Sequence, residues 1–582
     1  MRTNTNGELR ISDVNKVVTL TGWVAKRRDL GGLVFVDLRD RYGITQLVFN
    51  PDNANYEQAI SLKNEYVIKV TGKVVERSSK NPNLPTGDIE VVVDELTVLN
   101  TAKLPPLLIQ DQTDALEETR MRYRYLDLRR PVMQNNLMIR HKTTISIRNY
   151  FDKLNFVEIE TPILGKSTPE GARDFLVPSR VHLGSFYALP QSPQLYKQLL
   201  MVAGMDRYFQ IVKCFRDEDL RADRQLEFTQ VDLEMSFVDE EDVQTVVEGL
   251  LKQVWKDVLN QDIVTPFPRL SYDYAMDTYG SDKPDTRFEL HLQDISDWAS
   301  KLDFQVFKDN LENGGVVKAI VVNNGAQKYS RKEIDRLTLL AKKYHAKGLA
   351  WLKYEEAFSG SIVKFVTEEL ADELKAKLNV QANDLILIVS DKRENANKSL
   401  GALRRTIARE MNLIDEDKFN FLWVVDWPLF EYSEEEERFV AAHHPFTSPK
   451  AGHEELMLTH PELTKAKAYD IVLNGYEVGG GSIRIFDQDT QAKMFKAIGL
   501  SDEEVQLKFS YFVDALKYGT PPHGGLALGL DRLVMLITKN SNLREVIAFP
   551  VAASAKCLMS NAPTPVTDEQ LDELKLKVEE VK

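Results

Sequence analysis

The most informative segment of the chain is FRDEDLRADRQLEFTQ, residues 215–230. It begins with a run of mixed charge, continues through a polar loop and ends in residues 227–235, where apolar and polar residues alternate as in a β-strand. The pattern predicts a hairpin in which Arg216 and Phe228 face each other. A cation beside the flat face of an aromatic ring is a suitable place for a nucleotide base and its phosphates.

A second informative segment, GGLALGLDRL at residues 524–533, lies about three hundred residues further on. Its glycines precede an apolar helix, and Arg532 falls in the first turn of that helix. A positive charge at this end opposes the helix dipole, so we expect an anionic partner there. Together the two segments predict that Arg216 and Arg532 clamp the two ends of a polyphosphate, with Phe228 under the base.

These two segments are similar to motifs 2 and 3 of the class II aminoacyl-tRNA synthetases. Within subclass b of that class, essentially the whole chain resembles the bacterial-type aspartyl-tRNA synthetases. The resemblance implies an enzyme that activates L-aspartate with ATP to aspartyl-adenylate and transfers it to the 3′-terminal adenosine of tRNA-Asp. It also implies ATP and Mg²⁺ as cofactors and a homodimer.

The bulk composition is typical of a large globular protein. At 582 residues the chain is too long for one domain, and three or four are expected. Its two cysteines, Cys214 and Cys557, allow neither a disulfide framework nor a cysteine-based zinc site, which fits a reducing cytoplasm. We expect no membrane association, because the N-terminus is polar and no apolar run is long enough to cross a bilayer.

The charge of the chain is unevenly distributed. The net charge of -14 argues against RNA binding when taken as an average. Residues 120–148, however, hold eight Lys or Arg against one acid, Asp127, and residues 26–28 form a second basic cluster. These clusters are either solvated surface patches or two contact points for one long polyanion.

The pattern along the chain predicts an α+β multidomain fold. Residues 1–105 contain five short strands with turn residues between them, as in a small OB-type β-barrel. A long helix over residues 135–154 and a strand over 156–160 resemble motif 1, which implies a dimer interface. The expected domains are an OB-fold anticodon-binding domain (1–105), a linker (106–134), a catalytic domain in two parts built on an antiparallel sheet flanked by helices (135–282 and 421–553), an inserted α/β domain of bacterial type between them (283–420) and a C-terminal extension (554–582).

The nucleotide site implied by the resemblance draws on both motifs. Arg216, Arg532 and Glu477 are the expected catalytic residues. The full set of expected ATP contacts is Arg216, Asp217, Glu218, Gln225, Phe228, Glu477, Gly529, Leu530, Asp531 and Arg532. The alternative is a surface hairpin with ordinary salt bridges and an unrelated glycine-rich turn.

A metal is expected because a carboxylate must approach a polyphosphate of the same charge. The segment AYDIVLNGYEVGGGSIRI, residues 468–485, contains Asp470 and Glu477. A few carboxylates completed by phosphate oxygens and water are a common way to hold Mg²⁺, and the family places the ion on these two positions. The alternative is a pair of solvated carboxylates on a hairpin. The three glycines at 479–481 argue against it, because they weaken a strand unless another group must lie against the backbone.

The expected aspartate pocket includes a helix that begins after Ser192 and Pro193. Helical spacing puts Gln194, Lys197 and Gln198 on one face and the core-facing leucines on the other; a plain amphipathic helix is the alternative. The family pairs Lys197 with Arg484 on the substrate's side-chain carboxylate. The full set of expected aspartate contacts is Glu170, Ser192, Gln194, Lys197, Arg216, Asp232, His443 and Arg484.

The N-terminal barrel is expected to bind the anticodon. The positions that match the family are Arg28, Phe35, Gln46 and Glu90. Phe35 would stack on an unpaired base and Gln46 would hydrogen-bond its edge, although core packing is the commoner role of a strand phenylalanine. The arginines of residues 120–130 would contact the tRNA between its two ends.

Three other functions fit parts of the sequence. An asparaginyl- or lysyl-tRNA synthetase shares the barrel and motifs, but Lys197 with Arg484, the TPEGARDF string and the long insertion favour aspartate. A ligase that amidates aspartate through an adenylate would not need the barrel. A non-enzymatic RNA-binding relative would be expected to lack Arg216, Glu477 or Arg532. The sequence leaves open whether tRNA-Asn is also a substrate, and what the inserted domain does.

Overall fold

The computed structural model describes residues 1–168 and 172–579. By its internal contacts the chain divides into two units. The first consists of Met1–Lys142, Asp219–Gln225 and Asn540–Asp568, and the second of Thr143–Glu218, Leu226–Lys539 and Glu569–Lys582.

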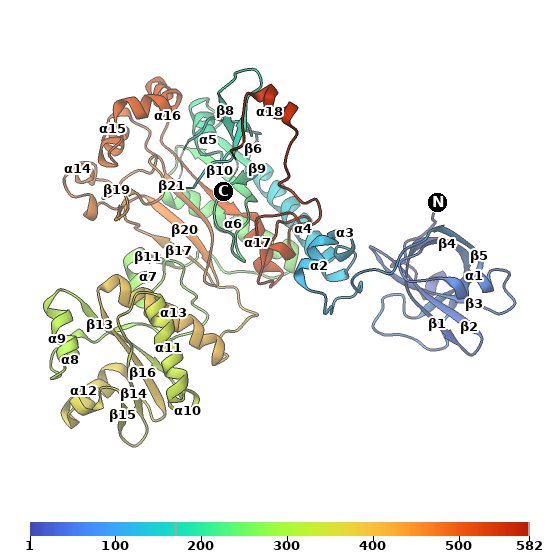
Figure 1. Ribbon diagram of the computed structural model, residues 1–582, viewed down its shortest axis with the longest axis horizontal. Helices are drawn as coiled ribbons and strands as arrows, with labels where there is room; N and C mark the ends of the chain where they lie inside the picture. The colour runs from blue at the N-terminus through green and yellow to red at the C-terminus, as the bar shows by residue number, and fades with distance from the viewer. Residues whose placement is uncertain (169–171, 580–582) are drawn as a thin grey trace. The chain divides into compact units, whose positions relative to one another are not determined.

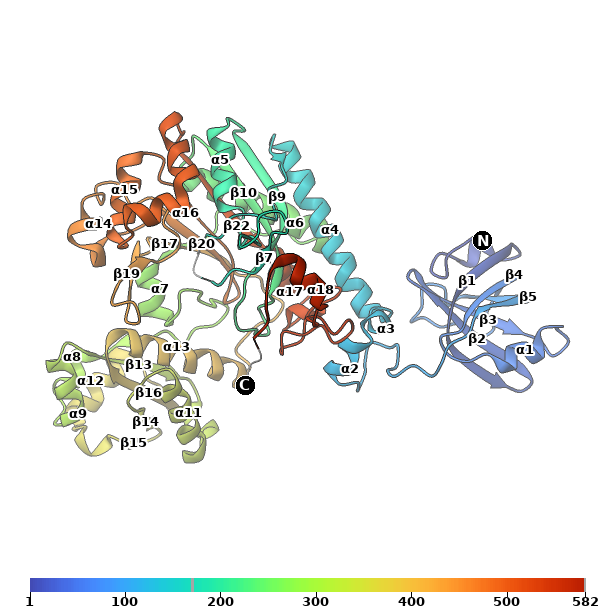
Figure 2. The same cartoon turned by 45° about the horizontal axis from the view of Figure 1, so that its top comes forward.

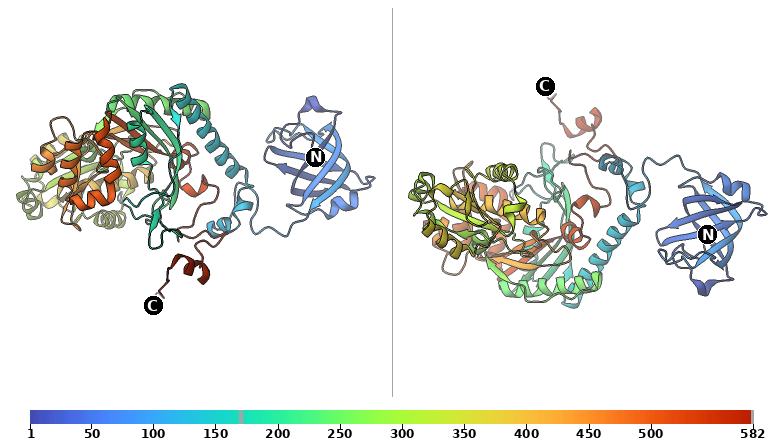
Figure 3. Two further views of the ribbon diagram at one scale, coloured as in Figure 1. Left: turned by 90° about the horizontal axis from the view of Figure 1, so that it is seen from above. Right: turned by 90° about the horizontal axis from the view of Figure 1, so that it is seen from below.

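The first unit contains the closed five-stranded barrel (Figures 1 and 3). Its strands follow one another around the barrel in the order β1 (Val17–Leu30), β2 (Leu33–Asp40), β3 (Gly43–Phe49), β5 (Ile89–Asn100) and β4 (Val67–Glu76), with α1 (Tyr56–Ser61) between β3 and β4. Val34, Val36 and Leu38 alternate into the core, as the period of a strand requires. The expected OB-type barrel is therefore confirmed.

Three further segments of the first unit follow the barrel in sequence. Two short helices, α2 (Glu117–Arg122) and α3 (Arg124–Asp127), precede the long helix α4 (Pro131–Lys153). The segment of residues 543–551, which opens with η5 (Leu543–Glu545), hydrogen-bonds to residues of α2 and α3. The third segment is Asp219–Gln225, the loop expected in motif 2.

The second unit is built on an eight-stranded sheet (Figures 1 and 2). Its inner six strands are antiparallel, and each outer strand runs parallel to its only neighbour. The order is β11 (Arg269–Ser271), β17 (Phe421–Val425), β20 (Ala468–Leu473), β21 (Tyr476–Ile483), β22 (His523–Gly529), β10 (Glu227–Ser236), β9 (Arg207–Phe215) and β6 (Val157–Glu158). The expected antiparallel catalytic sheet is confirmed.

Helices flank this sheet. They are α5 (Gln194–Val202), α6 (Glu240–Leu259), α7 (Tyr272–Tyr279), α14 (Leu456–Thr459), α15 (Gln488–Ala497), α16 (Asp502–Ala515) and α17 (Leu530–Ile537). Helix α17 follows β22 directly, with Gly529 as its N-cap. Four short strands form two hairpins outside the sheet, β7 (Leu176–Pro178) with β8 (Phe186–Ala188), and β18 (Phe430–Ser433) with β19 (Arg438–Ala441).

Close backbone contact explains the glycines of β21 and β22. A Cβ on Gly481 would lie 2.1 Å from the carbonyl oxygen of Gly525, and a Cβ on Gly525 would lie 2.0 Å from Oε2 of Glu234. Larger residues at these positions would displace β22 or the buried carboxylate of β10.

The inserted domain is a five-stranded antiparallel sheet with helices on both faces. Its strand order is β12 (Gln293–Asp294), β13 (Val316–Val322), β16 (Asp384–Asp391), β14 (Ala350–Tyr354) and β15 (Phe358–Gly360). Alternate residues of β13 enter two separate cores. One core includes α11 (Arg331–Lys343) and α13 (Arg393–Glu410), and the other includes α8 (Ser296–Ala299), α9 (Gln305–Glu312) and α12 (Glu368–Leu378).

The chain enters and leaves the inserted domain at neighbouring points. The side-chain amide of Asn420 donates to the carbonyl oxygen of Thr286 at 3.2 Å. The guanidinium of Arg404, on α13, donates to the carbonyl oxygens of Asp285 and Phe288 at 3.0 and 2.7 Å. A buried cation therefore holds the incoming strand of chain against the outgoing helix.

Several expected element boundaries shift. The strand expected at 156–160 is only Val157–Glu158, because the chain leaves the edge of the sheet before Pro162. Helix α4 begins at Pro131, where proline suits a first helical turn. Helix α5 begins at Gln194, one residue later than expected, and α18 (Asp568–Leu574) occupies part of the charged C-terminal tail. Within the described ranges, no helix combines the length and apolar character that crossing a membrane requires.

Candidate active site

Arg216 and Phe228 face each other at the open end of the β9–β10 hairpin. Phe228 pairs with Cys214, and the backbone N–H of Arg216 donates to the carbonyl oxygen of Leu226 at 2.9 Å. The Arg216 guanidinium lies 5.1 Å from the centre of the Phe228 ring. Its Nε is buried and has no hydrogen-bond partner among the described residues. The predicted opposition of the two side chains is confirmed.

Motif 3 meets motif 2 along the pairing of β10 with β22. Gln230 pairs with Gly529, the residue that caps α17. The carboxylate of Asp531 accepts the backbone N–H of Thr229, the neighbour of Phe228, at 2.7 Å. The first turn of α17 is thereby fixed beside the strand that carries Phe228.

The residues of motif 3 differ in what their side chains do. Arg532 donates from Nη1 to the carbonyl oxygen of Glu477 at 2.5 Å, which ties it to the strand of the expected metal site. Leu530 and Asp531 are 1% and 3% exposed. Their side chains seat α17 in the core and on β10.

Asp470 and Glu477 lie on the adjacent strands β20 and β21. A bulge in the pairing of these strands places Val472 opposite Glu477 and Asp470 opposite Gly480. Burial and the charge of Glu477 together raise the pKa of Asp470 to about 6, although His443 opposes the rise. A bound cation would stabilise the charged form of two neighbouring carboxyl groups, one of which is buried.

The donor set at this point fits Mg²⁺. Oδ1 of Asp470 is buried and has no hydrogen-bond partner among the described residues. A Cβ on Gly480 would lie 2.6 Å from that same oxygen, so glycine keeps its surroundings open. In residues 1–168 and 172–579, no cluster of three or more His, Cys, Asp or Glu side chains is suited to a metal.

The two cations of the expected aspartate pocket belong to one buried ionic network. Nζ of Lys197 lies 2.5 Å from Oδ1 of Asp232 and 3.4 Å from Oε2 of Glu234. Arg484 donates to the two carboxylate oxygens of Glu234 at 2.9 and 3.2 Å. All four side chains are at most 2% exposed. Helix α5 and strands β10 and β21 thus bring together two cations and two carboxylates.

The network settles which way the polar face of α5 points. Gln194, Lys197 and Gln198 are all buried, so the polar face of the helix points into the protein. Gln194 has a buried Nε2 without a hydrogen-bond partner among the described residues, and the hydroxyl of Ser192 accepts the backbone N–H of Gln194 at 3.3 Å. The alternative of a plain amphipathic helix with a solvated polar face is therefore wrong.

Two members of the network were not predicted from the sequence. Glu234 stands two residues after Asp232 on β10, so both point to the same side of the sheet. His444 places Nε2 at 2.8 Å from Nη1 of Arg484. Burial and the nearby Arg484 charge hold the pKa of His444 well below its usual range, so its ring is neutral. The alternation of strand β10 was the signal that could have revealed Glu234.

The remaining predicted residues lie in several places. The His443 ring packs edge-on against Trp427 at 4.9 Å, and its Nε2 is 3.8 Å from Asp470. Burial opposes its charge, but the carboxylates of Asp470 and Glu477 outweigh burial and raise the pKa of His443. Glu170 lies outside the described residues.

The residues beside Arg216 extend the β9–β10 hairpin. The backbone N–H of Asp217 donates to the carbonyl oxygen of Arg173 at 3.1 Å, and Glu218 is half-buried. Gln225 belongs to the first unit. There its side chain makes two hydrogen bonds to the backbone of Val551, and it is only 3% exposed.

The expected anticodon residues gather on the outer surface of the barrel. Arg28 pairs with Phe35 across β1 and β2 and donates to Gln46 at 3.1 Å, and Gln46 donates to Glu90 at 2.6 Å. Phe35 is half-buried between the fully buried Val34 and Val36, so it points out of the barrel and core packing is excluded. Asp37, which sequence reasoning missed, accepts from Arg28 at 2.6 Å.

The basic run of residues 120–130 is mostly internal. Arg120, Arg124 and Arg130 all donate to the carboxylate of Asp127, at 2.8–3.2 Å, and their side chains are 15%, 3% and 6% exposed. The predicted contact of these three side chains with tRNA is wrong, because they are buried against carboxylates and backbone carbonyl oxygens of the first unit. We refer to these four residues as the Asp127 cluster.

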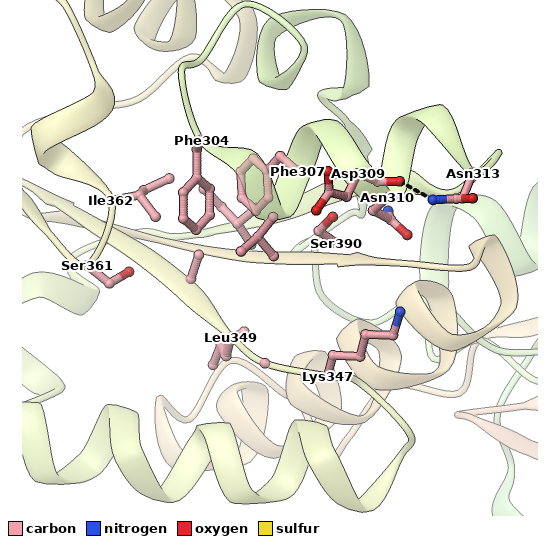
Figure 4. Close-up of a pocket in the computed structure, with 14 residues that line it drawn as sticks. Phe304, Phe307, Asp309, Asn310, Asn313, Lys347, Leu349, Ser361, Ile362 and Ser390 are labelled. Atoms are coloured by element: carbon pink, nitrogen blue, oxygen red, sulfur yellow. Dashed lines mark hydrogen bonds between the residues drawn. The ribbon is translucent and has the colours of Figure 1, made fainter.

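Two cavities of the second unit lie away from the predicted residues. One, of about 590 Å³, is in the inserted domain, where Phe304, Phe307 and Ile362 form an apolar end and Asp309, Asn310 and Lys347 a polar one (Figure 4). The other, of about 720 Å³, lies between α15 and α16. No residue of the predicted site lines either cavity.

Comparison with known proteins places the chain in a family. Residues 116–553 match the family described as tRNA synthetases class II (D, K and N), and residues 18–99 match the OB-fold nucleic acid binding domain. The aspartate–tRNA ligase of Macrococcus caseolyticus is 57% identical over 99% of this chain and 98% of its own length. The aspartate–tRNA(Asp/Asn) ligase of Bacillus mycoides is 56% identical over the same shares.

Solved structures show the same fold at low identity. An asparaginyl-tRNA synthetase from Pyrococcus horikoshii, complexed with asparaginyl-adenylate, matches with a TM-score of 0.58 and 20% identity over 93% of this chain and 96% of that one. The two motifs, the antiparallel sheet and the barrel agree with these matches, and the chain therefore belongs to the class II tRNA synthetases of the D, K and N group.

Proposed function

We propose that this chain ligates aspartate to tRNA-Asp at the expense of ATP, through an aspartyl-adenylate. The observation that carries the proposal is the buried network of Lys197, Arg484, Asp232 and Glu234. It offers cations for a side-chain carboxylate and carboxylates for an α-ammonium group. The closely related ligases named for aspartate support the same substrate.

Activation needs no nucleophile from the protein. The α-carboxylate of the substrate attacks the α-phosphorus of ATP in line, the bond to the β-phosphate breaks, and pyrophosphate leaves. Arg216 and Arg532 neutralise the phosphates while Phe228 supports the base, so the contribution of the protein is positioning and electrostatic stabilisation. The 3′-hydroxyl of the terminal adenosine then takes the aspartyl group, and AMP leaves.

The expected magnesium site lies on two neighbouring strands. Asp470 and Glu477 would hold the ion, and when bound it neutralises the repulsion between the substrate carboxylate and the phosphates. Oδ1 of Asp470, which lacks a protein hydrogen bond among the described residues, is the first ligand that we assign.

Selection against asparagine follows from charge. Asparagine has nearly the shape of aspartate but is neutral. It would therefore bring no negative charge to Lys197 and Arg484, and the electrostatic energy of these cations with Asp232 and Glu234 would be less favourable. A site built to pair a specific polar group rejects an analogue that lacks it by about 10⁴–10⁵-fold. Because His444 is held neutral beside Arg484, it accepts a hydrogen bond without adding a third positive charge.

The decisive test is pyrophosphate exchange with each amino acid in turn. We expect exchange to depend on aspartate and to be at least about 10⁴-fold less efficient, in kcat/KM, with asparagine. Exchange that prefers asparagine or lysine would reject the proposed substrate while leaving the family unchanged.

The RNA partner requires a separate assay. The outward-facing Arg28, Phe35 and Gln46 support readout of an unpaired anticodon base. The two relatives above are named for tRNA-Asp and for tRNA-Asp with tRNA-Asn. Aminoacylation of purified tRNA-Asp beside tRNA-Asn decides which of these two specificities the chain has.

A homodimer completes the proposal. Strand β6 forms one edge of the sheet, and the apolar side chains of Val157, Ile163 and Leu164 are 48%, 40% and 52% exposed there. Exposed apolar groups beside an open strand edge favour pairing with a second copy. Sedimentation at micromolar concentration should give the mass of a dimer. We also propose a cytoplasmic location, which is supported by the low cysteine content of the chain and by a role in protein synthesis.

A further inference from the structure

The first unit contains a continuous set of polar contacts between the barrel and the loop of motif 2. We propose that Asp127 and Gln225 are positioning residues in this set, so that RNA bound at the barrel adjusts the loop Asp219–Gln225 during catalysis. The inference rests on the proposed function, because it assigns the RNA to the barrel and the loop to the reaction.

The contacts begin at the base of the barrel. The buried carboxylate of Glu65 accepts from Arg39 of β2 at 2.7 Å and from Arg129 at 2.8 Å. The guanidinium of Arg129 also lies 4.9 Å from the ring centre of Trp23, on β1. Glu65 is 5% exposed, so the barrel and the residues just before α4 share an ion pair whose carboxylate is buried.

The next step is the Asp127 cluster. Arg130, the neighbour of Arg129, donates to Asp127 at 2.8 Å and to the carbonyl oxygens of Gln110 and Asp111 at 2.9 and 2.7 Å. Asp127 is fully buried. A displacement of Arg129 is thereby passed to a carboxylate that three guanidinium groups surround.

The cluster in turn fixes the segment of residues 543–551. Arg124 donates to the carbonyl oxygens of Ile547 and Ala548 at 2.8 and 2.9 Å, and Arg120 pairs with Glu545 at 2.8 Å. Arg124 also donates to the carbonyl oxygen of Arg544. Few side chains other than arginine can satisfy several carbonyl oxygens at once, which explains the residue type.

The last step reaches the loop. The side-chain amide of Gln225 donates to the carbonyl oxygen of Val551 at 3.3 Å and accepts its N–H at 3.0 Å. The backbone N–H of Leu543 donates to the carbonyl oxygen of Ala222 at 3.0 Å. Only Phe549 and Pro550 separate Ala548 from Val551, and proline restricts that short link. The loop is thus held at two points by a segment that the Asp127 cluster holds.

The geometry also gives Gln225 a different role from the predicted one. A side chain whose donor and acceptor both bind one residue's backbone acts as a clamp, and it is only 3% exposed. The loop connects Glu218 to Leu226, which lie two residues from Arg216 and from Phe228 in the chain. Its position therefore bears directly on how the ends of the hairpin are held.

The test uses the full chain and a synthetic anticodon stem–loop of tRNA-Asp. The stem–loop lacks an acceptor end, so it cannot reach a second site on the chain through one. We expect saturating stem–loop to change the KM for ATP in aspartate-dependent exchange by about fivefold or more, the lower limit of typical coupling between sites. No change in the wild-type chain would overturn the proposal.

The diagnostic variant is Glu65→Gln, which keeps the shape of the side chain and removes its charge. Its exchange without RNA and its affinity for the stem–loop should match the wild type within about twofold, whereas the response of the KM to the stem–loop should be lost. Arg122→Met, on the exposed side of α2 with a side chain 58% exposed, is the matched control and should respond as the wild type does. A full response of the KM in Glu65→Gln would overturn the proposal.

A second variant tests the other end. Gln225→Glu keeps the acceptor for Val551 but loses the donor, and Gln225→Met loses both. If Gln225 transmits the effect of bound RNA, the response of the KM should fall in steps across this pair. A response of wild-type size in both variants would reject the proposal. Absence of aspartate-dependent exchange in the wild type would instead reject the proposed function.

Discussion

At the scale of single residues, the site depends on charges that neutralise one another before any substrate is considered. Lys197 and Arg484 are fully buried, and each has a carboxylate within 3 Å. An unpaired buried cation would be costly, so Asp232 and Glu234 are required for the fold as well as for recognition. Arg216 is different, because its guanidinium lies over Phe228 and its Nε has no partner among the described residues.

Arg216→Ala tests this difference. We expect adenylate formation to fall by at least about 10³-fold, since the variant loses a group that stabilises the transferring phosphate, as oxyanion-hole deletions do. Folding should be unaffected, because the removed side chain makes a cation–π contact worth about 1 kcal/mol. Pyrophosphate exchange and thermal unfolding measure the two effects. Exchange at the wild-type rate would contradict the clamp of two arginines.

At the scale of elements, the position of strand β22 depends on the groups that pack against its glycines. Gly525 faces the carboxylate of Glu234, which in turn holds Arg484. Backbone pairing of β22 with both β10 and β21 leaves the strand little freedom to move away. A small change in this strand therefore reaches the cations of the pocket.

Gly525→Ala should reveal that dependence. The added methyl group would lie 2.0 Å from Oε2 of Glu234, so the carboxylate must shift. We expect a loss of about 1–3 kcal/mol in the free energy of unfolding, typical of overpacking, and a raised KM for aspartate with a smaller change in the KM for ATP. Gly348→Ala is the control, because a Cβ there meets no atom within 4 Å. Equal rises in both KM values would indicate general disorder of the sheet.

At the scale of the whole molecule, the first unit combines segments from three parts of the sequence. Burial opposes the charge of Asp127, but Arg120 and Arg130 outweigh it and hold the pKa of Asp127 below its usual value. An acid whose pKa is lower in the folded state stabilises the fold above its unfolded pKa of about 3.9, and that stabilisation is lost as pH falls through the folded pKa.

Asp127→Asn should therefore change how the protein responds to acid. At pH 7 we expect the variant to be about 3–5 kcal/mol less stable, as when one partner of a buried ion pair is removed. The difference from the wild type should shrink as pH falls below about 4, because the wild-type carboxylate is then protonated. Denaturant unfolding at a series of pH values measures this. A constant difference over that range would show that the charge of Asp127 is not responsible.

The barrel should also function when it is separated from the rest of the chain. Its core contains only residues between Leu9 and Val98, so residues 1–105 have the contacts needed to fold alone. We expect this fragment to bind an aspartate anticodon stem–loop, with affinity that decreases as salt increases. Phe35→Ala should reduce binding by about 1–3 kcal/mol, the usual value of one stacked base. Equal affinity for unrelated hairpins would exclude specific readout.

The sequence revealed those parts of the molecule whose chemistry is local. The opposition of Arg216 and Phe228, the five-stranded barrel and the antiparallel sheet follow from alternation and turns that neighbouring residues specify. Glu234 and His444 were missed because their shared partner, Arg484, comes from a distant segment. Arg120, Arg124 and Arg130 were misinterpreted for a related reason: besides Asp127, their partners are Glu545 and backbone carbonyl oxygens of distant segments, which a sequence pattern does not reveal.

The contact between Thr286 and Asn420 bears on how the inserted domain is attached. Since both ends of the domain meet at one hydrogen bond, the domain is inserted into the catalytic part as a closed loop, whatever its length. The two chain ends that connect the domain therefore lie side by side, and a domain of another size would join the sheet at the same place.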